Sequence, residues 1–286
     1  MAPVADGRRA RFAVSTRRVR SVGYARRVTD LQARPTTEPP SIVDLVARGT
    51  LDADLAALVW LLVEGEVPLV VIAPPTRLGA AAQLLLGVLA SIRPGSVTPE
   101  LEQPLGATAV RRLLRGRLPG GVIAGESLDD VYRILKAPPL PVSDEELTFL
   151  GCVLVLGGAE SPGSGAQSSA RSSAAPGGRL RVVAAHYVRP LARDAHGHAQ
   201  RLGPAVLATW NSERGHYEHF DWGILPEIAA RLGRRTGDLE LDLHHRRDDL
   251  GGLVKGKVTS LAEVRRLIAG YQVGYGHAHG ADHEAN

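Results

Sequence analysis

Apolar and polar residues alternate in blocks along the chain, and these blocks predict helices and strands of an α/β fold. After the three prolines of residues 34–41, apolar positions at helical spacing predict helices over residues 41–49 and 50–66. Residues 67–73, VPLVVIA, form an unbroken apolar run of strand length, which is typical of a strand covered on both faces. A helix over residues 79–92 follows after a short turn. A strand that leads into a helix in this way favours a layered α/β fold.

The same pattern continues beyond this unit. A helix over residues 107–118 and a strand over residues 120–126 are predicted next. Ser127 is placed to cap the following helix, and Pro138 stops it. Residues 143–158 then predict a capped helical turn and a second apolar strand.

The C-terminal half begins with residues 161–178, a low-complexity linker rich in serine, glycine and alanine. Beyond it, residues 179–188, 205–211 and 216–220 predict antiparallel strands joined by polar turns. Three amphipathic helices finish the pattern, and residues 274–286 are expected to form a loose tail.

Composition limits the chemistry that this fold can carry. The chain has 286 residues, of which 44% are hydrophobic and only 4% aromatic, so aliphatic side chains must build most of the core. Its one cysteine, Cys152, excludes an intramolecular disulfide and a zinc site built from cysteines. Cys152 lies in the apolar run LGCVLVLGG and is predicted to be a small core residue.

The net charge of +4 is concentrated at the N-terminus. Residues 1–34 hold nine arginines against two acids, Asp6 and Asp30. Such a segment is suited to contact nucleic acid or anionic lipid, and the alternative is a solvated arm without a specific ligand. We expect no membrane span and find no secretory signal. The expected location is therefore the cytoplasm, with a peripheral place at the inner face of the membrane as an alternative.

Four segments together carry a family resemblance: residues 41–73, 135–156, 205–220 and 250–272. Their order and local sequence resemble the secretion-type traffic ATPases, best the archaeal-like branch. This family comprises the hexameric motors of type II and type IV secretion, type IV and Tad pili, and the archaeal flagellum. The resemblance implies a RecA-like P-loop core with a reduced sheet, followed by a small antiparallel β region and C-terminal helices. For active relatives it implies ATP, Mg²⁺ and a ring-shaped assembly.

The turn after the first predicted strand aligns with the phosphate-binding loop of that family. A working loop reads G-x-x-x-x-G-K-[ST]: backbone amides hold the phosphates, the lysine neutralises their charge and the hydroxyl holds magnesium. Pro75, Thr76 and Gly79 agree with the usual family sequence GPTGSGKT. The candidate nucleotide loop consists of Pro74, Pro75, Thr76, Arg77, Leu78, Gly79, Ala80 and Ala81.

Three residues of this loop lack the groups that the chemistry needs. Pro74 replaces the first glycine and has no amide hydrogen. Ala80 replaces the lysine, and Ala81 replaces the hydroxyl that holds magnesium. One lost charge-assisted contact costs about 1.5–3 kcal/mol, and phosphoryl transfer depends almost wholly on such contacts. We therefore expect no hydrolysis of the family kind and no cofactor, with ATP and Mg²⁺ only as residual ligands, although Arg77 offers a charge elsewhere on the loop.

The middle of the predicted core is too short for all the motifs of an active relative, which are an acidic box, a Walker B glutamate and a histidine box. Glu100 or Glu102 is the candidate remnant of the acidic box. The next strand fits two registers. In one register Glu126 is the Walker B glutamate, and in the other Ala124 stands where the histidine belongs. Glu126 is equally well explained as an exposed acid beside a helix N-terminus.

Histidines offer few candidate metal ligands, and we predict no metal site. Residues 244–247, His-His-Arg-Arg, are interpreted as a solvated helix face. His216 and His219 of a predicted strand are interpreted as surface or half-buried residues rather than ligands. The glycine-rich tail also holds potential ligands, but a tail without a metal is favoured. These are His277, His279, Asp282 and His283.

The leading hypothesis is a non-catalytic homologue of a secretion or pilus motor ATPase, acting as a binding or regulatory subunit. The alternatives are a weak or partner-completed ATPase that uses Arg77 and Glu126, and a nucleic-acid-binding protein that uses residues 1–34. Expected partners are pilus or secretion motor proteins, including an active ATPase homologue, and a homo-oligomer is also open. The predicted parts are a basic arm (1–40), a degenerate P-loop core (41–160), a linker (161–178), a β-hairpin and helical part of the same domain (179–273) and a flexible tail (274–286).

Overall fold

The structure is a computed structural model that describes residues 38–138, 141–158, 180–193, 199–200 and 202–280. Its contacts divide the chain into two units, Met1–Glu38 and Pro39–Asn286, and the fold below is that of the second unit. The interpretations of the arginine-rich residues 1–34 and of the linker 161–178 fall outside the described residues, so they stay predictions.

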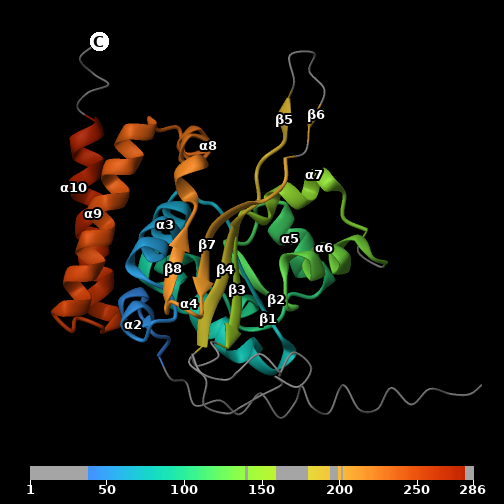
Figure 1. The fold of residues 1–286 in the computed structure, drawn as a ribbon, viewed down its shortest axis with the longest axis horizontal. Helices are drawn as coiled ribbons and strands as arrows, with labels where there is room; N and C mark the ends of the chain where they lie inside the picture. Colours follow the sequence, from blue (N-terminus) through green and yellow to red (C-terminus); the bar gives the residue numbers. More distant parts are fainter. Residues whose placement is uncertain (1–37, 139–140, 159–179, 194–198, 201, 281–286) are drawn as a thin grey trace, which may run out of the picture. The chain divides into compact units, whose positions relative to one another are not determined.

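A six-stranded mixed sheet forms the centre of the second unit (Figure 1), so the predicted α/β class is confirmed. β1 (Leu69–Ala73) lies between β2 (Gly120–Ala124) and β3 (Cys152–Gly158) and is parallel to both. The order across the sheet is β2-β1-β3-β4-β7-β8. Two further short strands, β5 (Ala192–Arg193) and β6 (Ala199–Gln200), pair with each other.

The antiparallel strands continue the same sheet instead of forming a small region of their own. β4 (Leu180–Tyr187) pairs with β3, β7 (Ala205–Asn211) with β4, and β8 (His216–His219) with β7. The expectation of a reduced sheet followed by a small β region is therefore corrected. The physical reason is that the buried backbone of β3 needs hydrogen-bond partners on both sides, and β4 supplies the second side.

β1 shows why its sequence is apolar without alternation. Every residue of the strand is buried. Leu69 and Val71 pack with the core formed by α3 (Ala53–Glu64) and α4 (Leu78–Ile92), whereas Val70 and Ile72 pack with helices on the opposite face. The prediction of a strand covered on both faces is confirmed, and the sheet is the middle of three layers.

The predicted helix starts are confirmed by their caps. Ser41 accepts from Asp44 N at the start of α2, Asp52 accepts from Leu55 N before α3, and Ser127 accepts from Asp130 N before α6. Ser143 forms a capping box with Glu146. The other helices before the C-terminal three are α2 (Ile42–Ala47), α5 (Ala107–Leu114), α6 (Leu128–Lys136) and α7 (Asp144–Leu147).

Three C-terminal helices follow the sheet (Figure 1): α8 (Leu225–Arg231), α9 (Thr236–Lys255) and α10 (Leu261–Gly280). α9 packs against α3, and α10 against α4. Helix α10 extends to Gly280, so residues expected to begin a loose tail are helical. Each residue added to a formed helix gains a hydrogen bond at little further cost, which explains how the helix runs into a glycine-rich segment.

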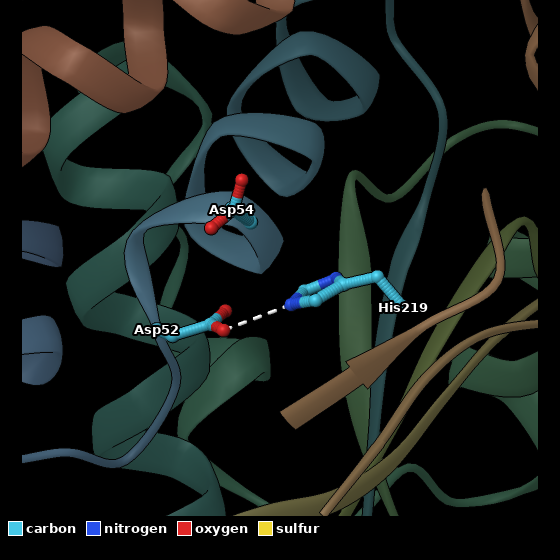
Figure 2. Close-up of side chains that lie close together, drawn as sticks. All are labelled: Asp52, Asp54 and His219. Atoms are coloured by element: carbon cyan, nitrogen blue, oxygen red, sulfur yellow. Dashed lines mark hydrogen bonds and ion pairs between the residues drawn. The ribbon is translucent and has the colours of Figure 1, made fainter. Parts of the chain in front are cut away.

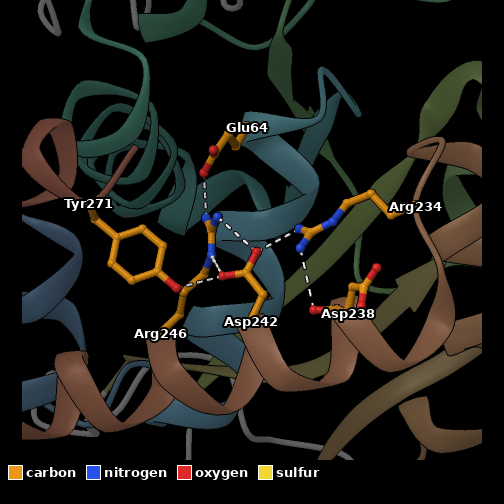
Figure 3. A network of polar contacts seen from close by, with 6 residues as sticks. All are labelled: Glu64, Arg234, Asp238, Asp242, Arg246 and Tyr271. Atoms are coloured by element: carbon orange, nitrogen blue, oxygen red, sulfur yellow. Dashed lines mark hydrogen bonds and ion pairs between the residues drawn. The ribbon is translucent and has the colours of Figure 1, made fainter. Parts of the chain in front are cut away.

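The interpretation of residues 244–247 as a solvated face is wrong for Arg246, whose side chain is only 2% exposed. Figure 3 shows its guanidinium between Asp242 of the same helix and Glu64 at the end of α3. Asp242 is completely buried and also accepts hydrogen bonds from Tyr271 Oη at 2.6 Å and Arg234 Nη1 at 2.6 Å. This buried polar network therefore joins α9 to α3 and α10.

One described segment, Pro75–Ile92, is long and apolar enough to cross a membrane by length and composition. Our expectation that no stretch reaches this length is therefore wrong. However, 61% of the segment is buried inside the protein, mostly as helix α4. The core helix of a folded domain passes the same test, so burial against the sheet and α10 already explains its apolar sequence.

Candidate functional site

The candidate nucleotide loop forms a tight turn. Pro74 follows β1, a 3-10 helix η2 covers Pro75–Arg77, and α4 begins at once with Leu78. The Arg77 N–H donates to the Pro74 carbonyl at 2.8 Å, and the two prolines have no N–H. No residue from 74 to 81 has a positive φ. A nest of amides in the αR-αL conformation needs such a left-handed residue, so the turn does not form a nest of this kind.

The residues aligned with the second glycine, the lysine and the hydroxyl of the motif lie at the start of α4. Gly79 and Ala80 are in its first turn, and Ala81 is completely buried in the core. Pro75 and Thr76 are exposed on the turn itself. The predicted strand, turn and helix are therefore confirmed as local structure, with the helix starting at Leu78.

Arg77 and Glu126 do not approach each other. The Arg77 guanidinium lies against the end of β3: a Cβ added to Gly158 would stand 2.5 Å from its Nη2 atom. Glu126 is exposed and follows β2, on the other side of β1. Strands two places apart are separated by about 10 Å. Among the described residues, no hydrogen bond or ion pair joins these two side chains.

The surroundings of Glu126 are those of a helix start. Its N–H donates to Asp130 Oδ2 at 3.1 Å, and the Ser127 hydroxyl donates to the same oxygen at 3.0 Å. These two hydrogen bonds, with the nearby Arg133, hold the pKa of Asp130 below its usual range. The arrangement favours the interpretation of Glu126 as an acid beside a helix N-terminus. Of the acidic-box candidates, Glu100 forms an ion pair with Arg112, and the side chain of Glu102 lies outside the described residues.

A second group of polar side chains, not predicted as a site, lies on the other side of the core. Figure 2 shows Asp52, Asp54 and His219, whose potential ligand atoms all lie within 4.8 Å of one another. Asp52 caps α3, with Oδ1 accepting from Leu55 N, while its Oδ2 lies 2.8 Å from His219 Nε2. His219 ends β8, and Asp54 stands in the first turn of α3.

This Asp–Asp–His cluster borders a cavity of about 310 Å³. The cavity lies between α3, the end of β8, the 3-10 helix η6 (Asp221–Gly223), α8 and α9. Its wall includes carboxylates, imidazoles and the indole of Trp222, and none of the described residues that line it is lysine or arginine. They are Asp54, His219, Asp221, Trp222, Leu225, Glu240, Leu243 and His244.

The pKa values of two groups in this region are raised by burial, a hydrogen bond and neighbouring carboxylates. The hydrogen bond to Asp52 raises the pKa of His219, against the opposing effect of burial. Burial raises the pKa of Asp221, and the charges of Asp54 and Asp52 act in the same direction. The cluster is thus suited to attract a cation.

Sequence reasoning missed this cluster because its parts are far apart in the chain. Asp52 and His219 are separated by 167 positions, and each has an ordinary local explanation as a helix cap or a strand residue. The available signal was the pair Asp52 and Asp54 at a helix start, together with the histidine of the HYEHFD stretch.

No family model matches the chain, and no curated protein matches it. The likeness to secretion-type ATPases therefore rests on the segments of the sequence analysis.

Proposed function

We propose that the chain is a non-catalytic relative of the secretion-type motor ATPases that acts by binding, as a subunit or regulator of a secretion or pilus system. A cytoplasmic location belongs to the same proposal. The observation that carries it is the tight turn between β1 and α4, where a strand–turn–helix unit remains but the phosphate-binding groups do not.

The placement of the unit supports a P-loop-like origin. β1 is flanked by parallel strands on both sides, and the turn leaves its carboxyl end. In open parallel sheets, ligand sites lie outside these carboxyl ends. The turn therefore occupies the place where a nucleotide site is expected, and a RecA-like core is the interpretation that joins this geometry to the family resemblance.

The chemistry of the turn supports the loss of catalysis. The Arg77 N–H donates to the Pro74 carbonyl, while Pro74 and Pro75 have no N–H group to donate to a phosphate. Arg77 contacts the end of β3, and among the described residues no ion pair joins it to Glu126. Without a lysine, a hydroxyl ligand for magnesium or an amide nest, ATP gains little on binding.

Titration calorimetry with ATP and Mg²⁺, paired with a phosphate-release assay, tests the loss of catalysis. We expect neither micromolar binding nor turnover, and the variants Arg77→Ala and Glu126→Ala should match the wild type. Turnover that both variants abolish would instead support the weak-ATPase alternative.

The binding role needs a separate test. An active secretion or pilus motor ATPase from the same cell is mixed with the chain, and its hydrolysis rate and sedimentation are followed. The proposal predicts a complex and a changed rate. If neither changes at micromolar concentrations of both proteins, the chain is not a subunit or regulator of that motor.

A further inference from the structure

We propose that Asp52, Asp54 and His219 form a binding site for one divalent transition-metal ion, a property beyond the proposed function and independent of it. The site lies at the N-terminus of α3 and the end of β8, and the cavity described above gives access to it.

The spacing of the donor atoms fits coordination of a single ion. Two donors of a tetrahedral zinc ion, each at about 2.1 Å, are about 3.4 Å apart. The hydrogen-bonded Asp52 Oδ2 and His219 Nε2 are 2.8 Å apart, so the two groups must separate by about 0.6 Å to bind one zinc ion. The side chain of Asp54 is 52% exposed and has the freedom to turn toward the same point.

Two of the three ligands are held in place by the fold. Asp52 is fixed because its other carboxylate oxygen accepts from Leu55 N at 3.0 Å. His219 is fixed by the pairing of β8 with β7, where it stands opposite Ala208. A site whose ligands are already positioned loses less conformational entropy when the ion binds.

The cavity supplies an independent argument for a cation. Besides Asp54 and His219, its wall carries Asp221, Glu240 and His244, and no lysine or arginine is among the described residues that line it. The guanidinium of Arg247 lies 3.7 Å from Asp54 Oδ1 through its Nη1, but it lies closer to Asp248, at 2.9 Å. The negative charge around the cluster is therefore only partly balanced.

The donor set indicates which ions fit. Two carboxylates and one imidazole suit zinc, manganese, iron or cobalt, whereas calcium takes six to eight oxygen ligands. Three protein ligands beside a cavity leave coordination positions open, as in zinc sites that bind water or a substrate. Zn²⁺ and Co²⁺ are accordingly the probes for this site.

Calorimetry with Zn²⁺ and visible absorption with Co²⁺ test the proposal on the full chain. We expect one Zn²⁺ per chain at micromolar or tighter affinity, and Co²⁺ absorption bands typical of mixed nitrogen and oxygen ligands. Asp54→Asn and His219→Gln should each weaken zinc binding at least tenfold. The control Asp249→Asn, which changes an exposed acid of α9, should leave the affinity unchanged.

Zinc binding by the tail histidines is the competing explanation for any zinc bound to the chain. A variant with His277→Ala, His279→Ala and His283→Ala should bind Zn²⁺ like the wild type. The proposal is overturned if this variant loses the ion, if Asp54→Asn binds as tightly as the wild type, or if the wild type binds no ion. Asp54→Asn keeps the hydrogen bond between Asp52 and His219. Its zinc affinity therefore still tests the proposal if His219→Gln fails to fold. ATP binding is measured separately, so the two proposals fail independently.

Discussion

The β1–α4 turn and the Asp–Asp–His cluster differ in how their polar groups are used. At the turn, an amide is bonded within the turn, the prolines donate nothing and Arg77 lies against the end of β3. At the cluster, carboxylates and an imidazole converge beside a cavity, and none of the described residues that line it is lysine or arginine. Consecutive residues can therefore match part of a motif without holding its chemical groups, while distant residues assemble groups suited to a ligand.

The largest loss of stability is expected for Arg246→Ala, which disrupts the buried polar network that joins α9 to α3 and α10. This change leaves Asp242 buried without its main cationic partner, and breaking a buried ion pair costs about 3–5 kcal/mol of unfolding free energy. Urea unfolding followed by circular dichroism measures the loss. The matched control is Arg247→Ala, whose half-exposed side chain should contribute less than about 1 kcal/mol. Equal effects of the two variants would mean that the buried network does not hold α9 to α3.

Asp52→Ala should have the next largest effect. It removes both the cap of α3 and the contact with His219, and loss of a cap alone costs about 0.5–2 kcal/mol. Asp52→Asn keeps a capping oxygen and removes the charge. Thermal unfolding of both variants separates the two roles, and a loss as large in Asp52→Asn as in Asp52→Ala would show that capping contributes nothing.

Lowering the pH should destabilise the buried network because the carboxylate of Asp242 becomes protonated. Burial acts to raise the pKa of Asp242, but hydrogen bonds from Arg246, Tyr271 and Arg234 hold it below its usual range. Its ionised form therefore contributes stability that is present above the unfolded pKa, about 3.9, and is lost as pH falls through the lower folded pKa. Unfolding free energies measured below pH 4 should fall more steeply for the wild type than for Asp242→Asn. Parallel curves would contradict this assignment.

The smallest effects on stability are expected at the candidate nucleotide loop and at Glu126. Arg77→Ala and Glu126→Gln change partly or fully exposed side chains, so each should alter the unfolding free energy by less than about 0.5 kcal/mol. Chemical denaturation measures this change. A loss above about 2 kcal/mol for Arg77→Ala would show that its contact with Gly158 is a structural anchor of the sheet.

Local signals in the sequence predicted much of the fold. The apolar run of β1 and the caps Ser41 and Ser127 act within a few residues, so their patterns are readable without tertiary information. The pairing of β4 with β3 was not readable, because 161–178 separates the strands and strand order depends on long-range hydrogen bonds. Nothing in the sequence joins Asp242 to residues of α3 and α10 until the helices pack.

The two candidate sites also differ in whether their residues are neighbours in the sequence. The loop was found because its residues are consecutive, whereas its tight turn became visible only from the Pro74–Arg77 hydrogen bond. His219 was interpreted as an ordinary strand residue, because its partner Asp52 is 167 positions away.

The most direct test of the central claim is calorimetric titration of ATP with Mg²⁺ into the full chain. The account predicts no heat beyond dilution, because the turn at Pro74–Arg77 offers neither an amide nest nor a magnesium ligand. Micromolar binding accompanied by phosphate release would contradict it and would mean that the loop still works as a nucleotide site.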